Sequence, residues 1–225
     1  MAPPLLINTI IMRIVSALFF CTLAASLLRA ASSEQEVSGS AVVREMNLAR
    51  QNPAAYAGYL EETRGNFNGR YFVLPGKTRI YTHEGVAALD EAIHFLRSAQ
   101  PLQPLAFSSG MSRGAADHCA SQAGGAIGHG NPASRMNRYG RWAATWGENI
   151  SYGKTCARDV VIALIIDDGL PARRHRANIF AAKFNYAGAA YGPHARYGSV
   201  CSIDFAGAYF EHGPSSAEPL VAKNY

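Results

Sequence analysis

The hydrophobic pattern changes from helical to strand-like along the chain, and this order limits the folds that the chain can adopt. Four stretches have helical spacing or a helical cap: residues 41–52, 86–96, 111–122 and 156–168. Near the end, residues 187–192 and 199–210 combine small and β-branched side chains around a turn, which predicts an antiparallel hairpin. Helices followed by strands predict one domain of the α+β class, or one with three layers.

Composition supports a folded, exported domain. The chain has 225 residues, of which 48% are hydrophobic and 16% charged. This length fits one domain, or one domain and a tail, and is sufficient for a core that does not depend on disulfides. The composition excludes disordered, collagen-like and coiled-coil chains. The formal net charge of +5 is not concentrated in a basic run, so no nucleic-acid partner is expected.

The N-terminal segment has the pattern of a secretory signal peptide. Arg13 precedes an apolar stretch at 14–28, and small residues follow at 30–33. The stretch is shorter than the roughly 20 apolar residues of a membrane-spanning helix. We therefore predict secretion to the extracellular space, or to a periplasm. An uncleaved N-terminal anchor is the alternative, and this segment is the one expected contact with a membrane.

Export makes a disulfide expected, because secreted proteins meet an oxidising compartment. Removal of the signal peptide leaves Cys119, Cys156 and Cys201. Cys119 lies in a predicted helix and resembles a small buried hydrophobic residue. The favoured pair is therefore Cys156–Cys201, although the sequence leaves the connectivity open.

Ionisable residues lie among glycines or beside a predicted helix end in three segments. These residues are His129, Glu148, the Asp167–Asp168 pair and His175. Two imidazoles and two carboxylates are suitable ligands for a divalent ion. A carboxylate beside a histidine also supports acid–base chemistry. Spacing alone does not distinguish such a site from ordinary packing and capping residues.

Four motifs follow one another along the chain: GHGNPASRMNRYG, GENISYG, DDGLPARRHRANIF and FNYAGAAYG. Their order resembles that of the CAP superfamily of cysteine-rich secretory, antigen 5 and pathogenesis-related proteins (SCP domains), and the bacterial members of this superfamily match best. The resemblance covers roughly residues 42–209. It implies a three-layer α/β/α sandwich with a central antiparallel sheet and a large open cleft. The segment 63–83 is an insertion relative to the family pattern.

The resemblance further implies a cleft tetrad of His129, Glu148, Asp168 and His175, with Asp167 as the alternative acid. A divalent ion lies on the two histidines in several relatives. His129 and His175 are therefore the implied metal ligands, with zinc foremost and calcium or magnesium as alternatives.

The chain is accordingly divided into four parts. These are a signal peptide at 1–31, a flexible segment at 32–40, the CAP domain at 41–211 and a C-terminal tail at 212–225.

Three functions are compatible with these residues. The first is a secreted binding module whose cleft holds a divalent ion and a peptide, lipid or cell-wall ligand. The second is a metal-assisted hydrolase, such as a peptidase, in which Glu148 acts as general base beside His129 and His175. The third is a carrier of lipids or sterols.

Overall fold

The computed structural model describes residues 38–73 and 79–212. The predicted signal peptide at 1–31, residues 32–37 of the predicted flexible segment and residues 213–225 of the predicted tail lie outside the described residues. Within the described part, no helix combines the length and apolarity that a membrane crossing requires.

The first two helices are separated by one residue that ends one helix and begins the next. Helix α2 (Gly39–Gln51) begins at Ser38, whose hydroxyl accepts the N–H of Ala41. Asn52 follows α2 and caps α3 (Pro53–Glu61), in which proline occupies the first helical position. The sequence pattern 41–52 thus forms one helix, and Pro53 starts another.

Five further helices follow along the chain. They are α4 (Val86–Ser98), α5 (Ser109–Gln122), α6 (Pro132–Met136), α7 (Ala157–Ile166) and α8 (Arg174–Ile179). The apolar run within α7 is a helix, as its flanks indicated. It ends at Ile166 because Asp167 adopts the left-handed conformation, with φ of 55°.

Four strands form the main sheet. They are β4 (Ala106–Phe107), β5 (Gly140–Tyr152), β6 (Tyr186–His194) and β7 (Gly198–Glu211). Their order is β4-β6-β7-β5, so β5 is an edge strand and β7 is central. Strands β6 and β7 form the predicted antiparallel hairpin, and β5 pairs antiparallel with β7. The short β4 pairs parallel with β6.

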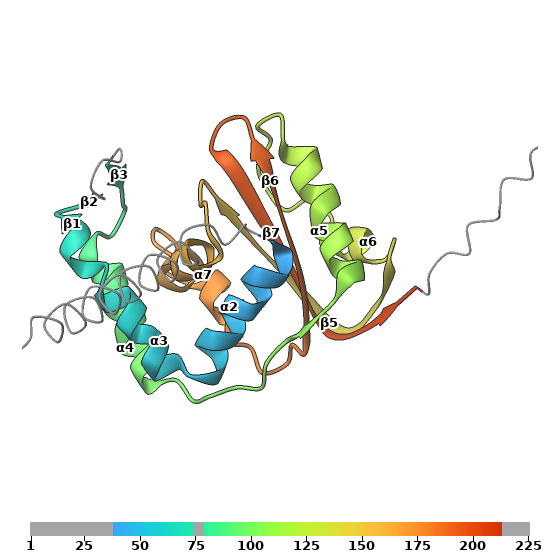
Figure 1. The fold of residues 1–225 in the computed structure, drawn as a ribbon, viewed down its shortest axis with the longest axis horizontal. Helices are drawn as coiled ribbons and strands as arrows, with labels where there is room; N and C mark the ends of the chain where they lie inside the picture. Colours follow the sequence, from blue (N-terminus) through green and yellow to red (C-terminus); the bar gives the residue numbers. More distant parts are fainter. Residues whose placement is uncertain (1–37, 74–78, 213–225) are drawn as a thin grey trace, which may run out of the picture. The chain divides into compact units, whose positions relative to one another are not determined.

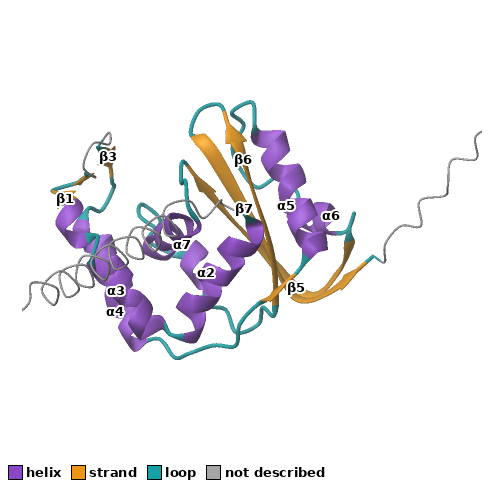
Figure 2. Cartoon of the chain, in the orientation of Figure 1, coloured by secondary structure: helices purple, strands orange, loops and turns teal. Residues whose placement is uncertain are grey.

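Helices cover both faces of this sheet, as Figures 1 and 2 show. Helices α5 and α6 lie on one side, and α2 and α7 lie on the other. Side chains alternate along β7, so Cys201, Ile203 and Phe205 join the core beneath α2 and α7. Ser202 and Asp204 therefore point toward the layer of α5 and α6. The prediction of a three-layer α/β/α sandwich of the α+β class is confirmed.

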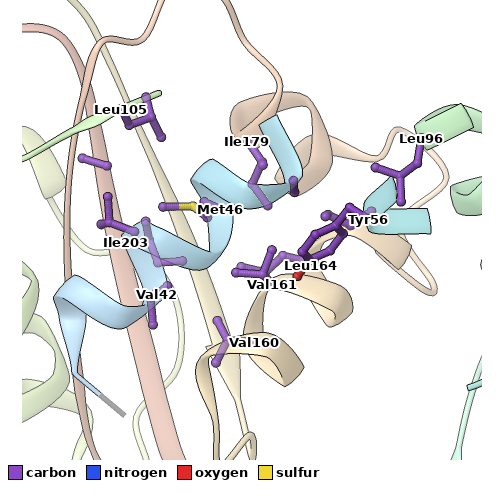
Figure 3. Close-up of a cluster of buried hydrophobic side chains, with 14 of the residues drawn as sticks. Val42, Met46, Tyr56, Leu96, Leu105, Val160, Val161, Leu164, Ile179 and Ile203 are labelled. Carbon is purple, nitrogen blue, oxygen red and sulfur yellow. The ribbon is translucent and has the colours of Figure 1, made fainter. Parts of the chain in front are cut away.

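The larger core joins α2, α3, α4 and α7 to the sheet. Val42 and Met46 of α2 pack with Leu164 of α7 and Ile203 of β7 (Figure 3). These four side chains are between 0% and 4% exposed. Their burial is the main favourable contribution of this layer to folding.

The insertion at 63–83 forms a small sheet of its own. A short 3-10 helix, η1 (Arg64–Asn66), leads into β1 (Phe67–Asn68), β2 (Tyr71–Phe72) and β3 (Ile80–Tyr81). The strands pair antiparallel in the order β1-β2-β3. Phe67 and Phe72 face each other across β1 and β2 with ring centroids 5.1 Å apart. The described residues of the insertion thus form secondary structure of their own.

The predicted Cys156–Cys201 disulfide is wrong. Cys119, Cys156 and Cys201 are all free thiols. Cys156 begins α7, where its Sγ accepts the N–H of Asp159 at 3.4 Å. Cys201 lies fully buried in central strand β7, and burial raises the pKa of its thiol. The first thiol is therefore a helix cap and the second is a core side chain.

Leu164 and Leu48 offer a matched test of this core. Leu164 is 4% exposed and Leu48 is 49% exposed. Leu164→Ala should lower the free energy of unfolding by about 2–5 kcal/mol, because it leaves a cavity between α2 and α7. Leu48→Ala should change it by no more than about 0.5 kcal/mol. Denaturant unfolding measures both values, and equal losses would contradict the assignment of the core.

Candidate functional site

Glu148 is the buried acid of the candidate site. It lies on β5, and its side chain is 1% exposed. One carboxylate oxygen lies 2.7 Å from Nδ1 of His129. The other accepts hydrogen bonds from the guanidinium of Arg135 and, at 3.2 Å, from the hydroxyl of Ser202. These partners satisfy a charge that would otherwise be costly to bury.

His129 reaches Glu148 from a loop that glycine makes possible. Gly128 and Gly130 on either side have φ of 107° and 58°, a region that favours glycine. Arg135 of α6 also donates to the backbone oxygen of His129 at 2.9 Å, so one guanidinium holds both members of the pair. The His129 side chain remains 56% exposed and its ring faces solvent.

His175 forms a second pair, and its acid is Asp167. Nδ1 of His175 lies 2.7 Å from one carboxylate oxygen of Asp167. The other oxygen accepts the backbone N–H of His175 at 2.9 Å. Asp167 is 3% exposed, whereas the His175 side chain is 21% exposed.

Asp168, the acid first assigned to the tetrad, is directed elsewhere. Its carboxylate accepts the backbone N–H groups of His83 and Glu84 at 2.7 and 2.8 Å. The alternative acid Asp167 therefore replaces it beside His175. The cause is the left-handed conformation of Asp167, which ends α7 and separates the directions of the two neighbouring side chains.

Two asparagines connect the pairs through β5. Asn149 donates to the backbone oxygen of His175 at 2.9 Å. Asn178 of α8 donates to the side-chain oxygen of Asn149 at 2.9 Å and to the backbone oxygen of Glu148 at 3.3 Å. Glu148 and Asn149 are consecutive residues of β5. The first belongs to the His129 pair, and the second contacts the backbone of His175 in the other pair.

Asp204 is a buried acid that no sequence motif identified. It lies opposite Glu148 in the β5–β7 register and is 0% exposed. Both of its carboxylate oxygens lack a hydrogen-bond partner among the described residues, as does Nε of Arg135. Burial, and then the Glu148 carboxylate, raises the pKa of Asp204 well above its usual range, while Arg135 opposes the shift. Asp204 is therefore a neutral acid beside the charged Glu148.

His118 of α5 lies behind the first pair. Its Nε2 is 2.9 Å from the backbone oxygen of Gly128 and 4.0 Å from Glu148. The side chain is 5% exposed, and burial lowers the pKa of its imidazole. A neutral ring that donates to Gly128 supports the loop that carries His129.

The donor set limits the kind of metal site that the chain can form. Across residues 38–73 and 79–212, no three histidine, cysteine, aspartate or glutamate side chains group as metal ligands. The two imidazoles instead each engage a carboxylate through Nδ1, an arrangement that leaves Nε2 for a ligand and recurs around zinc. The donors do not fit a closed site with four protein ligands.

A separate pocket of about 460 Å³ lies between the insertion and α7. Apolar side chains form most of its wall: Phe67, Phe72, Ile80, Ile162 and Ile166. Lys154, Thr155 and Asp159 contribute polar groups near the start of α7. This volume is in the usual range for small-molecule pockets. Neither histidine–carboxylate pair lines the pocket.

The protonation of Asp204 is testable through stability. Its folded-state pKa lies above the unfolded value near about 4, so the folded chain holds a proton that the unfolded chain releases. The stability that Asp204 contributes is therefore complete below that value and is lost as pH rises toward the folded pKa. Asp204→Asn cannot titrate, so its melting temperature should rise relative to the wild type as pH increases above the unfolded value of about 4.

Asp90→Asn, at a partly exposed carboxylate on α4, is the matched control for this measurement. A difference between Asp204→Asn and the wild type that stays constant over the pH range would contradict a neutral Asp204.

Family models and known proteins that resemble this chain indicate its family. The model of the CAP family, described as the cysteine-rich secretory protein family, matches residues 91–205, which include Glu148, Asp167 and His175. A search of curated proteins finds no match.

Two solved structures are similar at low identity. A cysteine-rich secretory protein from Staphylococcus aureus is 13% identical with a TM-score of 0.38, and the match covers 55% of this chain and 38% of that one. An outer surface protein from Borrelia burgdorferi is 16% identical with a TM-score of 0.39, over 47% of this chain and 78% of that one. The match thus spans well under half of the staphylococcal protein. The family model covers about half of this chain, and the chain belongs to the CAP family of cysteine-rich secretory proteins.

Proposed function

We propose that this CAP-domain protein is an extracellular binding protein that holds its ligand at the imidazoles of His129 and His175. The observation that supports this function is the pairing of each Nδ1 with a buried carboxylate. An ionised carboxylate can only accept a hydrogen bond, so at this distance each neutral ring carries its proton on Nδ1 and donates it to the carboxylate in a hydrogen bond. Among the described residues, neither Nε2 has a hydrogen-bond partner. Each ring therefore offers a lone pair whose direction is fixed by the protein.

A divalent ion is one ligand that these lone pairs suit, and zinc is the first choice because it readily takes histidine nitrogen. His129 and His175 would hold it, and water or an extracellular ligand would complete the coordination. The ion would supply positive charge that polarises an oxygen of that ligand. Glu148 and Asp167 would keep both rings oriented and would increase the basicity of the nitrogen that binds.

Calorimetric titration with zinc tests this function. The double variant His129→Ala, His175→Ala should lose zinc binding, because it removes both protein ligands. His94→Ala is the matched control, since His94 is an exposed residue of α4 outside both pairs. Equal zinc affinity of the double variant and the control would contradict the proposal. If the wild-type protein does not bind zinc, the proposed ligand is not this metal.

Hydrolysis receives less support from the geometry. Among the described residues, no serine, threonine or cysteine side chain forms a hydrogen bond with His129 or His175. A hydrolase would therefore need water as nucleophile, with Glu148 as base. Both carboxylate oxygens of Glu148 already accept hydrogen bonds from His129, Arg135 and Ser202, so a catalytic water would have to compete with these donors. Hydrolysis that is abolished by Glu148→Gln, without a change in melting temperature, would reverse this preference.

Lipid carriage is a second candidate, and the pocket beside the insertion favours it. Its apolar wall suits a single hydrocarbon chain, and Lys154 near its polar end suits an anionic head group. The family match begins at residue 91, whereas Phe67, Phe72 and Ile80 precede it. These residues therefore extend the wall beyond the matched region.

Titration with cis-parinaric acid, a fluorescent fatty acid, tests the pocket. Ile162→Trp places a larger side chain in it and should raise the dissociation constant at least about tenfold, or about 1.4 kcal/mol. Leu48→Trp, at an exposed position of α2, is the control and should bind as the wild type does. Equal binding by both variants would place the fatty acid elsewhere.

A further inference from the structure

Two segments form hydrogen bonds with each other close to His175. One consists of His83 and Glu84, at the end of the insertion, and the other is the turn at 167–173 between α7 and α8. Asp168 in the turn accepts the backbone N–H groups of His83 and Glu84. Glu84 in return accepts the N–H of Gly169 at 2.8 Å. The carboxylate of Asp168 thus binds backbone N–H groups of the 83–84 segment, and the carboxylate of Glu84 binds a backbone N–H group of the turn.

Glu84 also binds the last residue of the turn. Arg173 donates to its two carboxylate oxygens from Nη1 and Nη2, both at 2.7 Å. This guanidinium lowers the pKa of Glu84 to about 2. Nη1 of Arg173 donates to the backbone oxygen of Asp167 at 2.8 Å as well. One guanidinium therefore links Glu84 to the residue that orients His175.

The turn needs such support because of its backbone. Asp167 and Arg173, at its two ends, have φ of 55° and 47°. Residues with a side chain seldom adopt this region, and they remain there only when surrounding contacts hold them. Arg173 precedes α8 without a side-chain cap, and His175 is the second residue of that helix. Glu84 binds this turn at Gly169 and at Arg173, and Glu91 of α4 accepts a further hydrogen bond from Nε of Arg173 at 3.1 Å.

We infer that Glu84 is a positioning residue that keeps the Asp167 carboxylate in register with the His175 ring. Asp167 accepts both the backbone N–H and Nδ1 of His175, so a rotation of the turn would break both contacts. Glu84 does not touch the imidazole and acts through Arg173 and Gly169. It precedes the matched family region at 91–205, so this support is additional to that region. The inference rests on the proposed role of His175 as a binding residue.

Two-bond proton–nitrogen NMR tests this role, because it identifies the ring nitrogen that carries the proton. At a pH where the imidazoles are neutral, His129 and His175 of the wild type should both carry it on Nδ1. In Glu84→Ala, His175 should lose this signature and become a mixture of tautomers, while His129 should keep it. Glu84→Gln, which retains an acceptor but not the charge, should have an intermediate effect. Glu61→Ala, which breaks an exposed pair with Arg97, is the matched control.

An unchanged His175 signature in Glu84→Ala would overturn the inference. Equal loss of the signature at His129 and His175 in both Glu84 variants would overturn it too, because this would show general destabilisation. If Glu84→Ala does not fold, the Glu84→Gln spectrum decides. The readout uses no ligand, so its result is independent of zinc binding. Failure of the proposed function and failure of this inference are therefore distinguishable.

Discussion

The charge of Glu148 is the constraint on which the rest of the site depends. A carboxylate taken out of water is tolerated only if other groups compensate it. Arg135, His129 and Ser202 supply this compensation from α6, from a glycine loop and from β7. The neighbouring Asp204 is compatible with it because that acid is neutral. One buried charge thereby joins the glycine loop and α6, which are neighbours in sequence, to β7, which is distant in sequence.

The His129–Glu148 and His175–Asp167 pairs both combine a buried carboxylate with a histidine ring, and they lie on either side of strand β5. Side chains of consecutive residues in a strand point to opposite faces. Glu148 therefore contacts the layer of α6, and Asn149 contacts α8, the helix of His175. Both pairs depend on the position of the edge strand β5. In each pair the acid is buried and the imidazole is more exposed, so the protein fixes the orientation of the ring through Nδ1.

Much of the fold could be predicted from the sequence, because α4 and α5 have helical apolar spacing, the flanks of α7 indicate a helix, and small and β-branched residues around a turn indicate the final hairpin. Strand β5 could not, since its register shifts between Ala143 and Trp146 and Ala144 has φ of 67°. Motif order identified His129, Glu148 and His175. The choice between Asp167 and Asp168 depended on where α7 ends, which composition does not determine. Asp204 was identified only from the cross-strand register. The disulfide prediction did not take into account that the Cys156 side chain caps a helix.

The strand order has a consequence for the way the chain acquires its structure. The central strand β7 is the last described element, and both β5 and β6 pair with it. A ribosome must therefore synthesise almost the whole domain before the sheet can close. Until then the helices lack the sheet surface on which they pack. Such non-local pairing slows folding.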